Sequence, residues 1–568
     1  MTNIQSLKLS IHKFGIAGLL AFALPCISMA APFGIWNSAN STWIPIDGAL
    51  PGGVPGPGND AYIFDGTLQV GAGGNFNPQQ LIMGWESFHV GEFLQTGGTV
   101  RTEYWTKVGN AGNQVFNQSG GSFSAADLAV GWINPAVAGT PVGTGVMNLS
   151  GGTFESRAAT FIANEGATGT INISGGTYNA TGNGWGSFRI ADFGTGTGTI
   201  NLSGTGVVNA SQYTAVGGWG NGTLNISGGT WNQASGGIVV GDAADLNWTG
   251  RGDVNQSGGT VNADYVFLQK GTYNLNGGTL AAYGVADTRA ETTGVFNFNG
   301  GTLQARDNNA DFIQGDTVEI KSGGATIDTA GKEVWVNKGM SGAGGLTKTG
   351  SGILKLDGAN TYSGTTAVSQ GTLTVNGSLA GGVNVASGSL LKGSGTIGGA
   401  STVNGTLAAG NSPGQMTFSS DLALGSGSNL VWELFGNTSS DVSQFDRISV
   451  GGNLLASSGS GITLDFGTTA GGSLVDWSNA FWDSAQTWTF LTVAGTTTGF
   501  SSLSLLNSSY LDAAGNSLAT ARSGASFSLS QSGNNLVVNY VPEPSSGSLL
   551  FMGLVSLALL RARRSAQA

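Results

Sequence analysis

The phrase Asn148-Leu-Ser-Gly-Gly-Thr-Phe154 recurs with small changes through the first half of the chain. Two close copies are Asn172-Ile-Ser-Gly-Gly-Thr-Tyr178 and Asn225-Ile-Ser-Gly-Gly-Thr-Trp231. The copies begin at asparagines that are 31, 24, 29, 24, 30, 19 and 23 residues apart, namely Asn117, Asn148, Asn172, Asn201, Asn225, Asn255, Asn274 and Asn297. Periods of this size are typical of solenoids and of arrays of small units.

Each period has the composition of short strands joined by tight turns. Alternating runs such as Gly169-Thr-Ile-Asn-Ile173 flank a Gly-Gly corner, where glycine can take a positive φ at no steric cost. One such unit cannot bury its apolar face alone, but stacked coils can, each pairing in parallel with the next at about 4.8 Å. Propeller blades need about 40 residues, which is longer than this period. The sequence therefore predicts an all-β chain folded as a parallel β-helix, with the right-handed crossover that parallel strands prefer.

The eight asparagines are predicted to form a structural ladder. In stacked coils, each side-chain amide can bond to the same amide above and below it. The alternative is that the asparagines, or the threonines of Gly-Gly-Thr, form a ligand-binding face. An ice-binding face would need regular threonine pairs on a flat side, and Thr195-Gly-Thr-Gly-Thr199 offers such a pair once.

The two ends of the chain have the features of export and sorting signals. Lys8 and Lys13 precede an apolar stretch at 14–24 and the small residues that end in Ala30, which predicts a signal peptide at 1–30, cleaved between Ala30 and Ala31. At the other end, Pro542-Glu543-Pro544 precedes an apolar run at 548–560 and then a basic tail of Arg561, Arg563 and Arg564. Basic residues after an apolar helix favour a cytoplasmic position for this end.

The last 28 residues, 541–568, resemble the PEP-CTERM sorting signal of Gram-negative exopolysaccharide producers. This resemblance implies that an exosortase, a membrane cysteine protease-like transpeptidase, reads Pro542-Glu543-Pro544. It also implies a short transmembrane helix that anchors the chain transiently in the inner membrane. The same tail is sometimes given an ice-binding label.

A second resemblance lies in the middle of the chain. Gly344-Gly-Leu-Thr-Lys-Thr-Gly-Ser-Gly-Ile-Leu-Lys-Leu356 is followed by Gly358-Ala-Asn-Thr-Tyr-Ser-Gly-Thr-Thr366 and by Gly371-Thr-Leu-Thr-Val375. This stretch resembles the autotransporter-associated β-strand repeat, which is found in β-helical passenger regions. The resemblance implies passenger-like β-helical architecture around it.

These patterns predict five parts of the chain. After the signal peptide come β-solenoid repeats with an N-terminal cap around Trp43 at 31–340, and then the autotransporter-associated repeat at 341–400. A less repetitive β-rich section follows at 401–540, and the sorting signal occupies 541–568. The β-rich section holds Trp432, Trp477, Trp482 and Trp488, which we interpret as core or capping residues, with a carbohydrate-stacking site as the alternative.

Composition argues against most intracellular chemistry. Only 9% of the 568 residues are charged and the net charge is −11, so nucleic acid is not an expected partner. Outside 1–30 the chain has no cysteine and a single histidine, His89, which gives no support for Ser-His, Cys-His or metal arrangements. The pairs Asp307 with Asp311 and Asp441 with Asp446 are close in sequence only. We therefore predict no catalytic residues, no metal, no cofactor and no enzymatic activity.

The sequence thus predicts an exported structural or adhesive protein of the cell surface or extracellular matrix. Its expected partners are an exosortase-like enzyme, an exopolysaccharide of the biofilm or another surface polymer, and, before processing, the membrane. The alternatives are a carbohydrate-active β-helix enzyme and a glycan- or ice-binding protein.

Overall fold

The computed structural model describes residues 33–37, 42–46, 54–86, 88–133, 142–182, 186–191, 194–242, 250–287, 293–467 and 473–543. It forms two compact units, here called unit 1 (1–306 and 312–319) and unit 2 (307–311 and 320–568). The predicted signal peptide, its cleavage site at Ala30 and Ala31, Pro544, the apolar run and the basic tail lie outside the described residues. The predicted limits of the five parts stay predictions.

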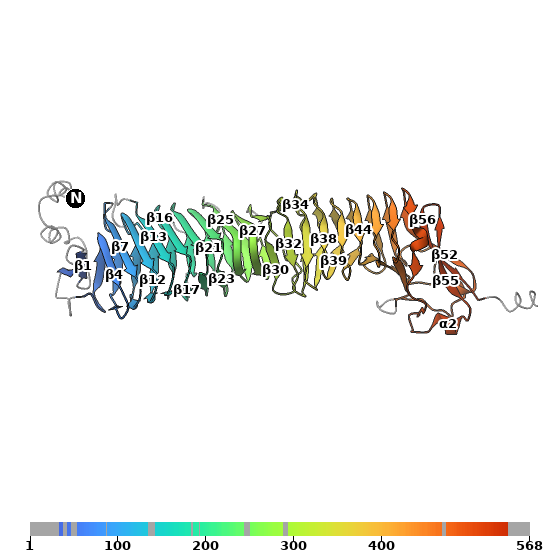
Figure 1. The fold of residues 1–568 in the computed structure, drawn as a ribbon, viewed down its shortest axis with the longest axis horizontal. Helices are drawn as coiled ribbons and strands as arrows, with labels where there is room; N and C mark the ends of the chain where they lie inside the picture. Colours follow the sequence, from blue (N-terminus) through green and yellow to red (C-terminus); the bar gives the residue numbers. More distant parts are fainter. Residues whose placement is uncertain are drawn as a thin grey trace, which may run out of the picture. The chain divides into compact units, whose positions relative to one another are not determined.

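Unit 1 is a stack of parallel coils (Figure 1). Most coils have three strands, and in two later coils the first two strands run together as β25 and β27. One coil consists of β13 (Thr144–Leu149), β14 (Thr153–Ser156) and β15 (Thr160–Ile162). The next coil places β16 (Thr168–Ile173), β17 (Thr177–Ala180) and β18 (Phe188–Ile190) in parallel register on these three strands. This pairing confirms the predicted parallel β-helix, while its handedness stays a prediction.

The strands of unit 1 form two sheets. One sheet contains β1 (Phe33–Asn37), β2 (Thr42–Ile46), β3 (Asp60–Ile63), β6 (Gln80–Met83), β9 (Trp105–Val108), β12 (Asp127–Val130), β15, β18, β21 (Thr214–Val216), β24 (Ile238–Val240), β26 (Tyr265–Leu268) and β28 (Gly284–Ala286). The other contains β4 (Gly66–Val70), β5 (Asn75–Phe76), β7 (Val90–Gln95), β8 (Thr99–Arg101), β10 (Asn113–Gln118), β11 (Ser122–Ala125), β13, β14, β16, β17, β19 (Thr197–Leu202), β20 (Val207–Ala210), β22 (Asn221–Ile226), β23 (Thr230–Gln233), β25 (Gly252–Asn262), β27 (Gly271–Ala282), β29 (Val295–Phe298) and β30 (Thr302–Ala305).

The Gly-Gly corners are required by close contact between coils. Gly176 has a φ of +69°, and a Cβ atom there would lie 2.6 Å from the carbonyl oxygen of Gly152, the matching glycine of the previous coil. A side chain would therefore be strained and would also push the two coils apart. At the start of unit 1, the antiparallel pair β1 and β2 brings Trp43 onto Phe76, with ring centroids 5.6 Å apart.

Unit 2 is also built of parallel coils. Its first complete coil has β35 (Leu346–Thr349), β36 (Ile353–Leu356) and β37 (Ala359–Asn360), and the next has β38 (Thr366–Val368), β39 (Thr372–Val375) and β40 (Ser378–Leu379). The strands that stack on β35 and β38 in later coils are β41 (Val383–Val385), β44 (Ser401–Val403), β47 (Leu422–Leu424), β50 (Leu454–Ala456) and β53 (Thr497–Thr498). The same sheet also contains β32 (Ala325–Asp328) and β34 (Ser341–Gly342), which come earlier in the chain. β31 (Thr317–Ile320) contains the division between the two units.

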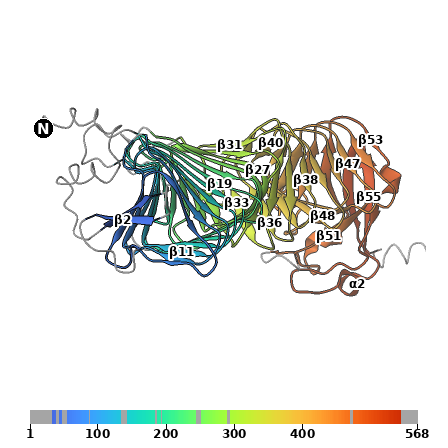
Figure 2. The same ribbon diagram turned by 60° about the vertical axis from the view of Figure 1, so that its left-hand side comes forward.

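The other two faces of unit 2 each form a sheet of their own. One consists of β33 (Glu333–Val336), β36, β39, β42 (Leu390–Gly393), β45 (Thr406–Ala409), β48 (Asn429–Glu433), β51 (Gly461–Asp465) and β54 (Ser504–Leu505). The other consists of β37, β40, β43 (Thr396–Ile397), β46 (Gln415–Phe418), β49 (Arg447–Val450), β52 (Gln486–Val493), β56 (Asn535–Val541) and β55 (Ser526–Ser532). Figure 2 shows β47 and β53 on a different face of unit 2 from β48 and β51.

Parallel coils extend further along the chain than the repeat phrases indicate. They run on to β54, well inside the section at 401–540 that the sequence marks as less repetitive. That section then ends in antiparallel pairs, because β56 pairs with both β52 and β55. Its short helices are η2 (Ala480–Asp483), η3 (Phe500–Ser502) and α2 (Leu518–Ala521). Across the described ranges we find no helix with the length and apolar character needed to cross a bilayer, and the run at 548–560 lies outside them.

Candidate functional site

The eight repeat asparagines lie in one file on the outer face of unit 1. Each Nδ2 donates to the Oδ1 of the asparagine one coil earlier, over 2.8 to 3.0 Å, from Asn148 on Asn117 to Asn297 on Asn274. Asn117 in turn donates to Glu92 Oε1 over 2.6 Å, so the file starts on a carboxylate. At its other end, Asn297 Oδ1 is buried and accepts no hydrogen bond from the described residues. The amides therefore bond mainly to one another.

A second asparagine file runs beside the first and was not foreseen from the sequence. Asn209 donates to Asn179, Asn232 to Asn209, and Asn262 to Asn232, each over 2.9 Å. The available signal was an asparagine two residues after the threonine of Gly-Gly-Thr, as in Thr177-Tyr-Asn179 and Thr230-Trp-Asn232. Two residues along a strand return to the same face, so this spacing places the asparagines on the outer side.

We expect Asn201→Ala to lower the free energy of unfolding by about 1–3 kcal/mol, because it leaves Asn172 Oδ1 and Asn225 Nδ2 without their partner. The matched control is Asn297→Ala at the end of the same file, which removes one such bond and should cost about half as much. Urea unfolding of both variants measures the difference. Equal losses at the two positions would contradict a ladder whose interior members bond on both sides.

Threonines are also paired across neighbouring coils of unit 1. Thr168 lies opposite Thr197, and Thr170 lies opposite Thr199. The pairing does not continue regularly, because Asn221 follows Thr197 in the next coil and Val146 precedes Thr170. Two adjacent coils therefore each carry a threonine pair of the kind that the ice-binding alternative needs. The sequence alone indicates such a pair in one coil.

His89 has a structural position. Its Nδ1 accepts the main-chain N–H groups of Trp85 and Glu86, over 3.1 and 3.0 Å, and its ring stacks on Phe64 with centroids 4.7 Å apart. Burial lowers the pKa of this imidazole, which favours the neutral ring that accepts these bonds. Within the described part of the chain, no group of three or more histidine, cysteine or acidic residues could hold a metal ion.

The carboxylates of Asp441 and Asp446 have different surroundings. Asp441 is exposed and bonds to Ser443, whereas Asp446 is buried. Asp446 accepts the N–H of Gly414 over 2.8 Å and that of Glu433 over 3.2 Å. Burial, followed by the negative charge of Glu433, raises the pKa of Asp446 to about 8. The charged groups that act on Asp446 are therefore Glu433 and, to a smaller extent, Asp465, which the sequence does not place beside it.

The four tryptophans of the C-terminal section are core residues. Trp432, Trp477, Trp482 and Trp488 are each no more than 1% exposed, which confirms their interpretation as core. Each indole Nε1 donates a hydrogen bond inside the protein, and the acceptors are the main-chain oxygens of Asp446, Asn516 and Thr438 and the side-chain oxygen of Asn437. Such buried rings offer no face to a sugar.

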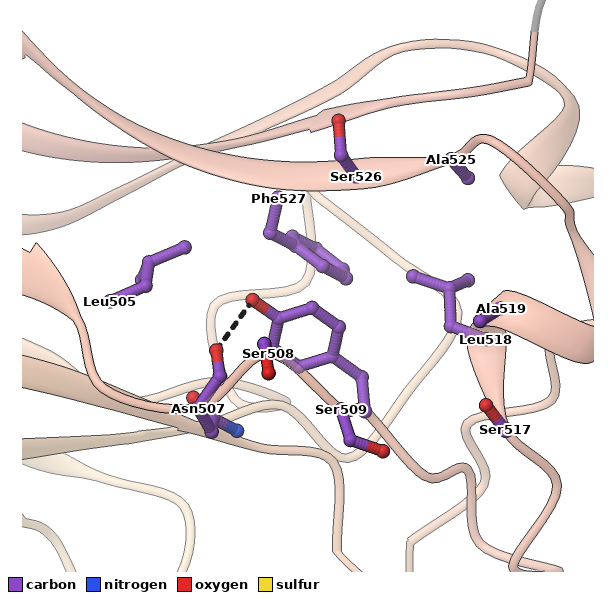
Figure 3. Close-up of a pocket in the computed structure, with 11 residues that line it drawn as sticks. Leu505, Asn507, Ser508, Ser509, Ser517, Leu518, Ala519, Ala525, Ser526 and Phe527 are labelled. Atoms are coloured by element: carbon purple, nitrogen blue, oxygen red, sulfur yellow. Dashed lines mark hydrogen bonds between the residues drawn. The ribbon is translucent and has the colours of Figure 1, made fainter.

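A pocket of about 480 Å³ opens beside this aromatic core (Figure 3). Its apolar lining comes from Leu505, Tyr510, Leu518 and Phe527, and the rings of Tyr510 and Phe527 meet edge to face with centroids 5.0 Å apart. The Tyr510 hydroxyl donates to the main-chain oxygen of Asn507 over 2.9 Å. The remaining lining is polar or small and uncharged: Asn507, Ser508, Ser509, Ser517, Ala519, Ala525 and Ser526.

The predicted sorting tripeptide is described in part. Pro542 and Glu543 directly follow β56, and Glu543 Oε1 lies 3.3 Å from Arg522 Nη1. Pro544, Arg561, Arg563 and Arg564 lie outside the described residues.

The coils, ladders and aromatic section together define an all-β protein built on parallel β-helices. A family model described as passenger-associated-transport-repeat matches residues 346–375, which run from β35 to β39 of unit 2. This match confirms the autotransporter-associated part of the resemblance stated above. The match does not show the other resemblance, that of the tail at 541–568 to the PEP-CTERM sorting signal.

Curated relatives are similar to short segments of the chain. The adhesin BmaC autotransporter of Brucella suis biovar 1 (strain 1330) is 41% identical over 83 residues, which are 15% of this chain and 2% of that protein. An extracellular serine protease of Serratia marcescens is 38% identical over 108 residues, 19% of this chain and 10% of that protein. A second match of the same name and organism is 49% identical over 59 residues, 10% of this chain and 6% of that protein. The chain thus spans a tenth or less of the length of each of these relatives.

The similarity to extracellular serine proteases contradicts our prediction that the chain has no enzymatic activity. That prediction rested on composition, with His89 as the single histidine outside 1–30 and no cysteine there. Composition cannot report which serines, acidic residues or histidines the fold of a relative brings together, so it could not exclude this class. The prediction is withdrawn.

Proposed function

We propose that this chain is an exported protein of the cell surface or extracellular matrix with a structural or adhesive role. The observation that carries the proposal is the passenger-associated repeat at 346–375, which forms part of a continuous stack of parallel coils in unit 2. Such coils bury their apolar residues between neighbours and need no disulfide, which suits a long scaffold outside the cell. The similarity to an adhesin supports the adhesive role.

Export and sorting in this proposal use the two ends of the chain. Residues 1–30 direct export and are cleaved between Ala30 and Ala31. An exosortase-type enzyme reads Pro542-Glu543-Pro544, while the apolar run at 548–560 and its basic tail hold the chain transiently in the inner membrane. The order of tripeptide, apolar run and basic residues supports this assignment.

The partner in this proposal is an exopolysaccharide, and the pocket beside Phe527 is its binding site. Aromatic rings provide an apolar floor that suits the face of a sugar, and serine hydroxyls at the rim can donate and accept hydrogen bonds. The volume lies within the range of small-ligand sites. No side chain of the lining carries a charge, which favours a neutral sugar unit over an acidic one.

Filling the pocket should release the polymer. Ser508 is exposed and lines the pocket, so Ser508→Trp occupies its volume with little effect on the core. We expect at least about a tenfold weaker retention of the purified chain by the exopolysaccharide of the producing cell, measured by co-sedimentation, which corresponds to the loss of one aromatic contact and its hydrogen bonds.

The matched control is Ser458→Trp, an equally exposed serine outside the pocket lining, which should leave retention unchanged. Equal losses in the two variants would exclude the pocket as the binding site. Reducing sugar is measured in the same samples, and its release by the native chain would favour the carbohydrate-active alternative over the adhesive one.

A further inference from the structure

Glu543, the central residue of the tripeptide, is held against the folded C-terminal section by a buried arginine. The strand β56 ends at Val541, and two residues later Glu543 Oε1 lies 3.3 Å from Arg522 Nη1. The Arg522 side chain is only 8% exposed. The contact is therefore part of the folded section and differs from a pair between two freely solvated side chains.

The guanidinium of Arg522 is held in place by contacts other than Glu543. Its Nε donates to the main-chain oxygen of Trp477 over 2.5 Å, and its Nη2 donates to that of Asn479 over 3.0 Å. These bonds direct Nη1 toward the end of β56. A buried positive charge also needs a carboxylate nearby, since an uncompensated charge is costly away from water.

Two carboxylates share Nη1. Asp483 Oδ1 lies 2.8 Å from it and Glu543 Oε1 lies 3.3 Å from it, although the Asp483 side chain is 65% exposed. Asp483 therefore competes with Glu543 for the same donor group. Removing the Asp483 charge leaves Glu543 as the only described carboxylate on Nη1, and removing Arg522 releases Glu543.

The docked carboxylate is partly covered where it meets Arg522. Glu543 Oε2 is buried and accepts no hydrogen bond from the described residues. Oε1 is paired with Arg522, while the Glu543 side chain as a whole is 37% exposed, so the residue can be reached from solvent but this oxygen is engaged. An enzyme that binds this carboxylate with its own donors must first separate it from Arg522.

We propose that Arg522 is a latch which holds Glu543 on the folded section, so that processing at Pro542-Glu543-Pro544 requires release of Glu543 from Arg522. This inference rests on the proposed sorting function. In this scheme Arg522 is a positioning residue that acts on the tripeptide and takes no part in the cleavage itself. The partner must offer cationic or amide donors of its own to a carboxylate flanked by prolines.

The latch is tested with two variants of the full chain that should act in opposite directions. Arg522→Gln should speed processing in the producing cell by about threefold, the size of a partly exposed charge pair, and Asp483→Asn should slow it by a similar factor. Pulse-chase labelling followed by immunoblotting gives the processing rates. A purely structural effect would change both variants in the same direction, and that result, or unchanged rates in both, would overturn the latch.

A second measurement separates failure of the latch from failure of the sorting proposal. Hydrogen exchange of the purified full chain reports how tightly the backbone at 539–543 is held, with no sorting enzyme present. We expect faster exchange in Arg522→Gln and slower exchange in Asp483→Asn. Wild-type chain that is never processed would overturn the sorting function. Exchange that is identical in all three chains would overturn the latch, whatever the processing rates.

Discussion

Phe154→Ala should lower the free energy of unfolding by about 3–5 kcal/mol. Phe154 is fully buried on β14, and its ring stacks on Phe123 one coil earlier and on Tyr178 one coil later, with centroids 5.1 and 5.0 Å away. Since each coil contacts only its neighbours, losing this ring weakens both interfaces of its coil at once. Urea unfolding of the purified chain, followed by circular dichroism, measures the change.

The matched control for this aromatic stack is Phe88→Ala. Phe88 belongs to the same unit but is 65% exposed, so its truncation should change stability by less than about 0.5 kcal/mol. Similar losses at Phe154 and Phe88 would contradict a core made of rings stacked from coil to coil. A large loss at Phe154 alone would support it.

The second large effect is a fall in stability as the pH rises from about 5 to about 7. Burial raises the pKa of Asp446 to about 8 in the folded chain, from the ordinary value of 3.8, so between these values the folded state holds a proton that the unfolded state has lost. The contribution of Asp446 to the free energy of unfolding therefore decreases by roughly 1.4 kcal/mol per pH unit, or about 3 kcal/mol over this interval, until Asp446 ionises near pH 8.

Two substitutions isolate this titration from that of other groups. The asparagine in Asp446→Asn cannot ionise, so the free energy of unfolding should fall less steeply between pH 5 and pH 7. The difference in slope should correspond to about one proton, whatever the absolute stability of the variant. Glu433→Gln removes the neighbouring negative charge that raises the pKa of Asp446, so the fall in stability should end at a lower pH. An Asp446→Asn slope equal to that of the native chain would show that another group titrates.

The repeats of unit 1 could be predicted because each coil repeats one phrase. The regular asparagine before Ser-Gly-Gly-Thr predicts parallel strands with the side chains of Asn172 and Asn201 in one file, and the structure places them there. The second file, through Asn209 and Asn232, was overlooked although its spacing is equally regular. Its asparagines follow an aromatic or aliphatic residue that differs from coil to coil, so no fixed phrase marks them.

The coils at 401–505 could not be predicted in the same way. Their strands are two to eight residues long and carry no shared phrase, so only alternation remains as a signal. The residues that surround Asp446 could not be predicted from the sequence either. Parallel stacking sets Glu433 opposite Asp465, 32 positions later, and the bend after β48 returns the chain to Asp446. Contacts of this kind depend on coil length, which varies along the chain.

Two features of the C-terminal section required the folded structure. The pocket combines Leu505 with Phe527, and the latch combines Arg522 with Glu543, in each case across intervening turns and strands. No local motif marks Arg522, because its role comes from the main-chain oxygens of Trp477 and Asn479 that direct its guanidinium.

The central claim is that the chain reaches the cell surface and is retained there by exopolysaccharide. The most direct test is labelling of intact producing cells with an antibody against the purified chain, before and after enzymatic removal of the exopolysaccharide. We expect labelling of unpermeabilised cells that falls when the polymer is removed, with the chain recovered in the supernatant. Labelling that appears only after the cells are permeabilised would contradict surface localisation, and labelling unaffected by removal of the polymer would contradict its role as the partner.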